Sequence, residues 1–118
     1  MAIVLQRIYG EKTQAEGYRI LIDRLWPRGI SKQNANLDEW AKEIAPSTTL
    51  RKRYNNKPEE FDAFKQAYKA EIYEDPEKLA RLNALKDLAK NERIILLYGS
   101  KDERYNHAIV LKEMLEEN

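Results

Sequence analysis

Arg93-Ile94-Ile95-Leu96-Leu97-Tyr98, with Asn91 before it and Gly99 after it, is the clearest strand in the sequence. The run from Ile94 to Tyr98 has no polar interruption. A short apolar run bounded by turn-forming residues is typical of a strand that is buried on both faces. We therefore expect residues 93–98 to form a central strand of a parallel sheet.

Two earlier segments have the same character. Residues 3–9 begin with Ile3-Val4-Leu5, and residues 18–23 read YRILID, a nearly continuous apolar run. A polar stretch over 10–17 separates them and is predicted to be a loop. The three strands are expected to lie in one sheet, with the third next to one of the other two.

Helices are predicted over 37–44, 47–54, 58–72, 76–88 and 106–116. The first of them rests on four apolar residues at the i, i+3, i+4, i+7 spacing of a helix stripe, namely Leu37, Trp40, Ala41 and Ile44. The alternation of strands and helices predicts one α/β domain over 1–118, a small sandwich whose short, mostly parallel sheet is flanked by helices. Six side chains on the apolar faces are expected to be mostly buried: Trp40, Phe61, Phe64, Leu82, Leu96 and Leu111.

The composition excludes several classes of function. The 118 residues include 21 Lys and Arg against 20 Asp and Glu, one His and no Cys. Thiol catalysis, disulfides and thiolate metal sites are excluded, and no metal or other cofactor is expected. The net charge of +1 does not favour nucleic-acid binding. No apolar run reaches the ~20 residues that cross a bilayer, and no signal peptide is evident, so a cytoplasmic protein without a membrane partner is expected.

The first candidate site follows the second strand, where residues 23–29 read DRLWPRG. Ligands of open parallel sheets bind at the carboxyl ends of the strands. Arg24 and Arg28 are spaced to grip an anion, because each guanidinium offers a planar fork of donors. Trp26 offers a flat face for stacking. The alternatives are that Trp26 belongs to the core and that Arg24 pairs with Asp23 or a helix carboxylate.

The second candidate site follows the third strand, where Gly99 and Ser100 precede Lys101 and Asp102 and lead to Asn106 and His107. The start of the last helix favours an anion, because its backbone N–H groups are unpaired and its dipole is positive there. Lys101 would add charge. Asp102 and His107 are candidate acid–base groups, although Asp102 also fits a helix cap and His107 a structural role.

Two further features lie in the helical middle of the chain. Glu71 falls on or beside the apolar stripe that contains Tyr68, so it needs a partner. Arg24 or Arg28 would serve, and Tyr68 and Glu71 would then orient the arginines. Residues 51–57 are basic, which indicates either a solvated helix face or a surface for a partner.

These residues resemble the YeaO-like branch of domain-of-unknown-function family 488. The resemblance rests on residues 23–29, on Ala45-Pro46-Ser47, and on Asn106-His107-Ala108, and it covers nearly the whole chain. It implies no established biochemical activity. Broader relatives carry a Cys-His-Arg step at the start of the last helix, and the corresponding step here has Asn106 instead of the thiol. Thiol chemistry of those relatives therefore does not transfer to this chain.

The sequence leaves two functions open. One is binding of, or catalysis on, an anionic small molecule, phosphorylated or nucleotide-like, at the carboxyl ends of the strands. Its catalytic candidates are His107 and Asp102, its ligand-binding candidates are Arg24, Trp26, Arg28, Lys101 and Asn106, and its supporting residues are Asp23, Tyr68 and Glu71. The alternative is a non-enzymatic module that binds a protein or nucleic acid through residues 51–57. Neither reading predicts an oligomeric state.

Overall fold

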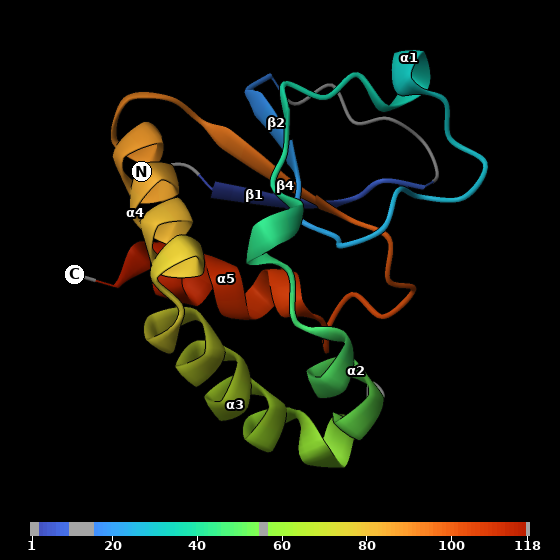
Figure 1. Ribbon diagram of the computed structural model, residues 1–118. Coiled ribbons are helices and arrows are strands. Elements are labelled where there is room, and N and C mark those ends of the chain that lie inside the picture. Colours follow the sequence, from blue (N-terminus) through green and yellow to red (C-terminus); the bar gives the residue numbers. More distant parts are fainter. Residues whose placement is uncertain (1–2, 10–15, 55–56, 118) are drawn as a thin grey trace.

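The computed structural model describes residues 3–9, 16–54 and 57–117, and its centre is a four-stranded sheet (Figure 1). The strands are β1 (Ile3–Arg7), β2 (Tyr18–Leu21), β3 (Glu39–Trp40) and β4 (Ile94–Tyr98). Their order is β1-β4-β2-β3, and each pairing is parallel. The predicted α/β fold and the central position of residues 94–98 are confirmed. The loop expected over 10–17 falls mostly outside the described residues.

Strand β4 lies between β1 and β2, and all five of its residues are buried. Successive side chains of a strand point to opposite faces of the sheet. Ile94, Leu96 and Tyr98 accordingly belong to the larger apolar cluster, whereas Ile95 and Leu97 belong to a smaller one on the other face. The sheet thus separates two cores, as the uninterrupted apolar run predicted.

The larger core lies between the sheet and three helices. The helices of the chain are α1 (Lys32–Ala35), α2 (Thr48–Tyr54), α3 (Phe61–Glu74), α4 (Pro76–Asn91) and α5 (His107–Glu116), with 3₁₀ turns at Lys42–Ile44 and Pro58–Glu60. Figure 1 shows α3, α4 and α5 gathered on one side of the sheet. Tyr68, Leu82 and Leu111 from these three helices are fully buried there.

The smaller core is covered by a loop rather than by a long helix. Leu21, Ile95 and Leu97 form its buried centre, and Trp26 and Trp40 pack against them with one ring edge toward the other at 5.3 Å between centroids. The indole N–H of Trp40 donates to the Asp23 carbonyl at 2.8 Å. The segment between β2 and β3, which carries α1, therefore closes this face.

The helix predicted over 37–44 is wrong. Residues 39–40 form the edge strand β3, and a short 3₁₀ turn follows at 42–44. Backbone N–H groups of Asp38 and Ala41 donate to Arg19 and Leu21 at 2.9 and 2.8 Å. The helix-like spacing is fortuitous, because Trp40 packs into the smaller core whereas Ala41 and Ile44 pack into the larger one. Pairing of residues 39–40 with β2 satisfies the backbone groups at the open edge of β2. A helix over 37–44 would have left those edge groups of β2 unpaired.

Helices α2, α4 and α5 each begin directly after a capping residue, whereas α3 begins at Phe61, after the 3₁₀ turn at Pro58–Glu60, and not at residue 58 as predicted. Ser47 Oγ accepts the N–H of Leu50 at the start of α2, Asp75 caps α4 and Asn106 caps α5. Of the six expected core residues, Leu82, Leu96 and Leu111 are fully buried. Trp40, Phe61 and Phe64 are only partly buried. Within the described ranges, no helix has the length and apolar character needed to cross a membrane.

Candidate functional site

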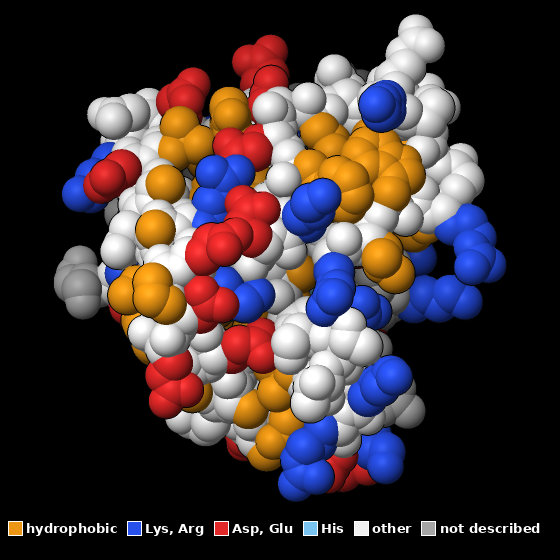
Figure 2. Space-filling view, viewed as in Figure 1, with side chains coloured by type: hydrophobic (Ala, Val, Ile, Leu, Met, Phe, Trp, Pro, Cys, Tyr) orange, Lys and Arg blue, Asp and Glu red, His pale blue; other side chains and the backbone are white. Residues whose placement is uncertain are grey.

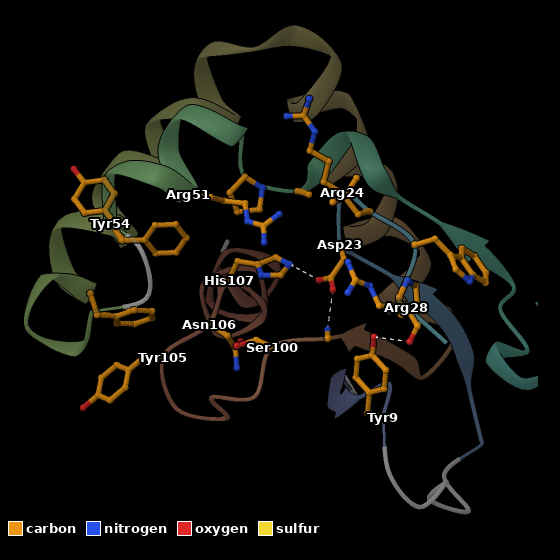
Figure 3. A pocket seen from close by; sticks show the side chains of 18 of the residues that line it. Tyr9, Asp23, Arg24, Arg28, Arg51, Tyr54, Ser100, Tyr105, Asn106 and His107 are labelled. Carbon is orange, nitrogen blue, oxygen red and sulfur yellow. Dashed lines mark hydrogen bonds and ion pairs between the residues drawn. The ribbon is translucent and has the colours of Figure 1, made fainter. Parts of the chain in front are cut away.

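A cavity of about 290 Å³ lies at the carboxyl ends of the strands. The residues just after β1, β2 and β4 line it, and so does the start of α5 (Figure 3). Its far side is formed by α2 and by the first turn of α3. The two strand ends that the sequence singled out therefore meet at one site. Of the predicted site residues, five line the cavity besides His107, namely Asp23, Arg24, Trp26, Arg28 and Asn106.

Asp23 connects the ends of two strands with the start of α5. Its Oδ2 accepts the N–H of Gly99 at 2.8 Å, and its Oδ1 lies 3.1 Å from His107 Nε2. The same Nε2 lies 3.0 Å from the carbonyl oxygen of Ile22. Both neighbours of Nε2 can only accept, so the ring carries a hydrogen on that atom. Asp23 Oδ1 is buried and receives no hydrogen bond, so the hydrogen is directed to the carbonyl.

This arrangement leaves Nδ1 of His107 with the free lone pair when the ring is neutral. His107 is half-buried and lines the cavity, so Nδ1 is the atom of the ring that can accept a proton or a hydrogen bond from a ligand. Tyr68 packs its ring edge-on against the imidazole at 6.3 Å between centroids. The imidazole is therefore held in place by contacts on two sides.

A tight turn places Arg28 at the rim. Pro27 and Ile30 close the turn with a 3.4 Å hydrogen bond, and Gly29 occupies a φ of +82° that favours glycine. The hydroxyl of Tyr9 donates to the Arg28 carbonyl at 3.0 Å. These contacts fix the backbone of Arg28 and leave its guanidinium to the cavity.

Four cationic side chains line the cavity, namely Arg24, Arg28, Arg51 and Lys57, and Asp23 is the only carboxylate among the described lining residues. In the part of the chain that the structure describes, none of these four charged groups has a hydrogen bond or an ion pair. Figure 2 shows Lys and Arg side chains gathered along the side of the molecule that carries α2 and the loop after β2. The alternative that Arg24 pairs with Asp23 or a helix carboxylate is therefore wrong, and the rim of the cavity is positively charged.

Trp26 lines the cavity but is largely a packing residue. Its indole N–H donates to the Ile30 carbonyl at 2.6 Å, and its ring packs against Trp40 in the smaller core. The alternative that Trp26 belongs to the core is therefore supported, and a stacking role toward a ligand stays a prediction. Asn106 is similarly occupied, because its Oδ1 accepts the N–H of Ile109 and its amide nitrogen donates to the Asp102 carbonyl.

Lys101 and Asp102 do not line the cavity. Asp102 Oδ1 accepts the N–H groups of Arg104 and Tyr105 at 2.8 and 2.9 Å, so its carboxylate builds the loop before α5. The turn that results brings Tyr105 to the cavity and leaves Lys101 exposed. The prediction that Lys101 shares one concavity with Arg24, Arg28 and His107 is therefore wrong for Lys101.

Tyr68 and Glu71 support the site from behind, without touching the arginines. Tyr68 donates its hydroxyl to the Ile44 carbonyl at 2.7 Å, and burial raises the pKa of this phenol well above its usual value. Glu71 accepts the N–H of Ser47 at 2.8 Å. Both residues thus tie α3 to the segment 44–47, which carries Ala45 and Pro46 into the cavity wall. The expected ion pair of Glu71 with Arg24 or Arg28 is not formed.

A family model described as the inactive DUF488-N3 subclade matches residues 2–118. The chain belongs to this DUF488 subclade. It is 44% identical to the uncharacterised protein YeaO of Escherichia coli over 115 residues, which cover 98% of this chain and 97% of YeaO. It is 33% identical to the uncharacterised proteins Rv3073c of Mycobacterium tuberculosis and Mb3100c of Mycobacterium bovis, over 92% of this chain and 89% of theirs. No solved structure matches the chain significantly.

The structure of this DUF488 chain adds residues that the sequence did not assign to the site. The basic residues Arg51 and Lys57 belong to the cavity, although the sequence reading placed them on a separate surface. Aromatic residues also line it, namely Tyr9, Tyr54, Phe61, Phe64 and Tyr105. The sequence shows tyrosine and phenylalanine residues close to basic residues. It does not show which of these side chains face the cavity, because that depends on how α2 packs against α3. Among the described residues, no group of His, Asp and Glu is arranged to hold a metal ion.

Proposed function

We propose that this DUF488 protein binds a small anionic molecule with a phosphate group at the carboxyl ends of its strands. The observation that carries the proposal is the set of four unpaired cations around one cavity of about 290 Å³. Arginine suits phosphate because its fork of donors matches two oxygens at once. Unpaired like charges repel one another across the cavity, and an anion relieves this repulsion.

The size of the cavity limits the ligand. Small-molecule sites measure about 300–1,000 Å³, so this one is at the small end. It suits one compact phosphorylated metabolite rather than a dinucleotide or a polymer. Arg28 and Arg51 approach the central space from opposite sides in Figure 3, whereas Arg24 extends outward at the rim. We therefore assign Arg28 and Arg51 the main contacts with the phosphate and Arg24 a contribution to long-range attraction.

Binding without turnover is the form of the proposal that the observations favour. The subclade is described as inactive, and Asn106 stands at the position where broader relatives are expected to carry a thiol. Asp102 is occupied by loop hydrogen bonds, so His107 remains as the one acid–base candidate. In a binder, His107 donates or accepts a hydrogen bond with the ligand through Nδ1 and transfers no proton during a reaction.

The alternative function, a protein- or nucleic-acid-binding module at residues 51–57, stays a prediction. Arg51 and Lys57 of this segment line the cavity, whereas Lys52 and Arg53 are exposed outside it. The segment is thus divided between the cavity and the surface. This division gives more support to a small ligand than to an extended partner.

Isothermal titration calorimetry with ribose 5-phosphate tests the proposal. The double variant Arg28→Ala/Arg51→Ala should bind at least tenfold more weakly than the parent, because each lost charge-assisted hydrogen bond is worth about 1.5–3 kcal/mol before solvent screening. Arg28→Lys keeps the charge and removes the fork, so it separates bidentate contact from simple attraction.

The double variant Lys52→Ala/Lys101→Ala is the matched control, because it removes the same charge from exposed positions that do not line the cavity. It should bind ribose 5-phosphate as the parent does. The proposal is refuted if the parent binds no phosphorylated probe, or if the cavity variant and the control variant bind equally.

A further inference from the structure

One side of the cavity is a wall of aromatic rings. Tyr54 comes from α2, Phe61 and Phe64 from the first turn of α3, and Tyr105 from the loop before α5. We call these four residues the aromatic wall. Phe61 packs edge-on against Tyr105 at 5.3 Å between centroids, and Tyr54 packs edge-on against Phe64 at 6.0 Å. The rings therefore hold one another in fixed positions before any ligand arrives.

The aromatic wall leaves part of its ring surface open to the cavity. All four residues are only partly buried, and Phe61 and Phe64 pack against the edge of the larger core while also lining the cavity. Leaving apolar ring surface in water costs about 25 cal/mol for each Å², so such surface inside a cavity indicates a ligand with an apolar face. Figure 3 shows the hydroxyl ends of Tyr54 and Tyr105 pointing away from the centre of the pocket. Their rings, not their hydroxyls, are thus offered to the ligand.

The aromatic wall and the charged groups occupy different sides of the same cavity. In Figure 3, Tyr54 and Tyr105 lie on one flank, Arg28 and Tyr9 lie on the other, and Arg51 and His107 lie between them. A ligand that uses both sides needs a flat apolar part and an anionic part separated by a short polar link. A sugar phosphate alone would leave the aromatic wall uncovered.

We infer that the ligand is a nucleoside 5′-monophosphate, with its base against the aromatic wall and its phosphate between Arg28 and Arg51. This inference rests on the proposed function and names the ligand class of the same site. Bases stack on aromatic side chains whatever their identity, because every base has a π face. The volume of the cavity, about 290 Å³, suits one base and one phosphate better than a dinucleotide. Ribose hydroxyls in the middle then face Ser100 and His107, which offer polar groups there.

Calorimetric titration with AMP, UMP, ribose 5-phosphate and adenosine tests the inference. AMP or UMP should bind at least tenfold more tightly than ribose 5-phosphate, because a base–aromatic contact contributes a factor of this size. Adenosine, which lacks the phosphate, should bind at least tenfold more weakly than AMP. Tyr105→Leu should remove most of the advantage of the nucleotide and leave the affinity for ribose 5-phosphate unchanged.

Tyr73→Leu is the matched control, because Tyr73 is an exposed tyrosine of α3 outside the cavity. Its nucleotide affinity should equal that of the parent. Should Tyr105→Leu fail to fold by circular dichroism, Tyr54→Leu on α2 provides an independent variant of the aromatic wall.

The outcomes distinguish failure of the nucleotide inference from failure of the proposed phosphate site. Equal binding of ribose 5-phosphate, AMP and UMP overturns the nucleotide inference and leaves phosphate binding in place. An unchanged nucleotide advantage in the folded variant of the aromatic wall overturns the inference as well. Binding of adenosine as tightly as AMP, or the absence of binding by all four probes, overturns the proposed phosphate site itself.

Discussion

Replacing Tyr68 by Phe removes one buried hydrogen bond and leaves the ring in place. The phenol donates to the Ile44 carbonyl at 2.7 Å, and both residues have no exposed surface. Water cannot replace the lost donor, so the carbonyl stays unpaired in the variant. An unsatisfied buried acceptor costs about 1–3 kcal/mol, and we expect the free energy of unfolding at pH 7 to fall by about this amount.

The pH dependence of this loss follows from the raised pKa of Tyr68. Burial is the main cause of the shift, and the nearby carboxylates of Glu71 and Asp23 add to it. Above the ordinary tyrosine pKa of about 10, the unfolded chain releases the phenol proton while the native state keeps it. Ionisation therefore favours unfolding of the parent and has no counterpart in the variant. The deficit of Tyr68→Phe should shrink by about 1 kcal/mol between pH 10 and pH 11.

Urea denaturation of parent and variant at several pH values, followed by circular dichroism, measures both effects. Tyr73 and Tyr98 also have raised pKa values, but both are present in each protein and cancel in the difference. A deficit below about 0.5 kcal/mol at pH 7 would contradict the hydrogen bond to Ile44. A deficit that stays constant up to pH 11 would contradict the buried, protonated phenol.

Three further substitutions test the packing around the site. Phe64→Ala should cost about 2–3 kcal/mol in urea denaturation, less than a fully buried Phe, because the ring is only partly buried. Glu71→Ala should cost about 1–3 kcal/mol by leaving the Ser47 N–H unpaired, and Glu71→Gln, which keeps an acceptor, should recover more than half of the loss. Gly17→Ala should lower the thermal midpoint, because its Cβ would lie 2.8 Å from the backbone oxygen of Arg93, whereas equal midpoints would show that the strands tolerate the contact.

Local chemistry made the strands predictable. Residues 94–98 are apolar on both faces, and only a central strand of a parallel sheet buries both faces of so short a run. Ser47 and Asp75 mark helix starts in the sequence because each accepts backbone N–H groups of its own helix, whereas the cap of the last helix is Asn106 and not Asp102. These signals depend on neighbours in the chain and need no knowledge of the tertiary structure.

Tertiary packing decided the parts that sequence reasoning missed. The apolar spacing from Leu37 to Ile44 fits a helix, yet the open edge of β2 recruits residues 39–40 as a strand. The positive charge of Lys101 suggested an anion site. The turn held by Asp102, however, places Tyr105 at the cavity and leaves Lys101 outside it. The local sequence does not distinguish Arg51 and Lys57, which line the cavity, from Lys52, which does not. Only the contact of α2 with α3 decides which of these side chains face the cavity.

The segment from Asp23 to Trp40 covers one face of the sheet and also presents Arg24 and Arg28 to the cavity. Trp26 and Trp40 fasten it by packing against each other and by hydrogen bonds to the Ile30 and Asp23 carbonyls. In most α/β proteins, the loops that determine ligand specificity can be exchanged without disturbing the scaffold. Here any insertion or exchange in the segment 23–40 also uncovers Leu21, Ile95 and Leu97. New ligand preferences in this lineage should therefore arise by point substitution at the cationic positions, and loop grafting into this scaffold should fail by unfolding.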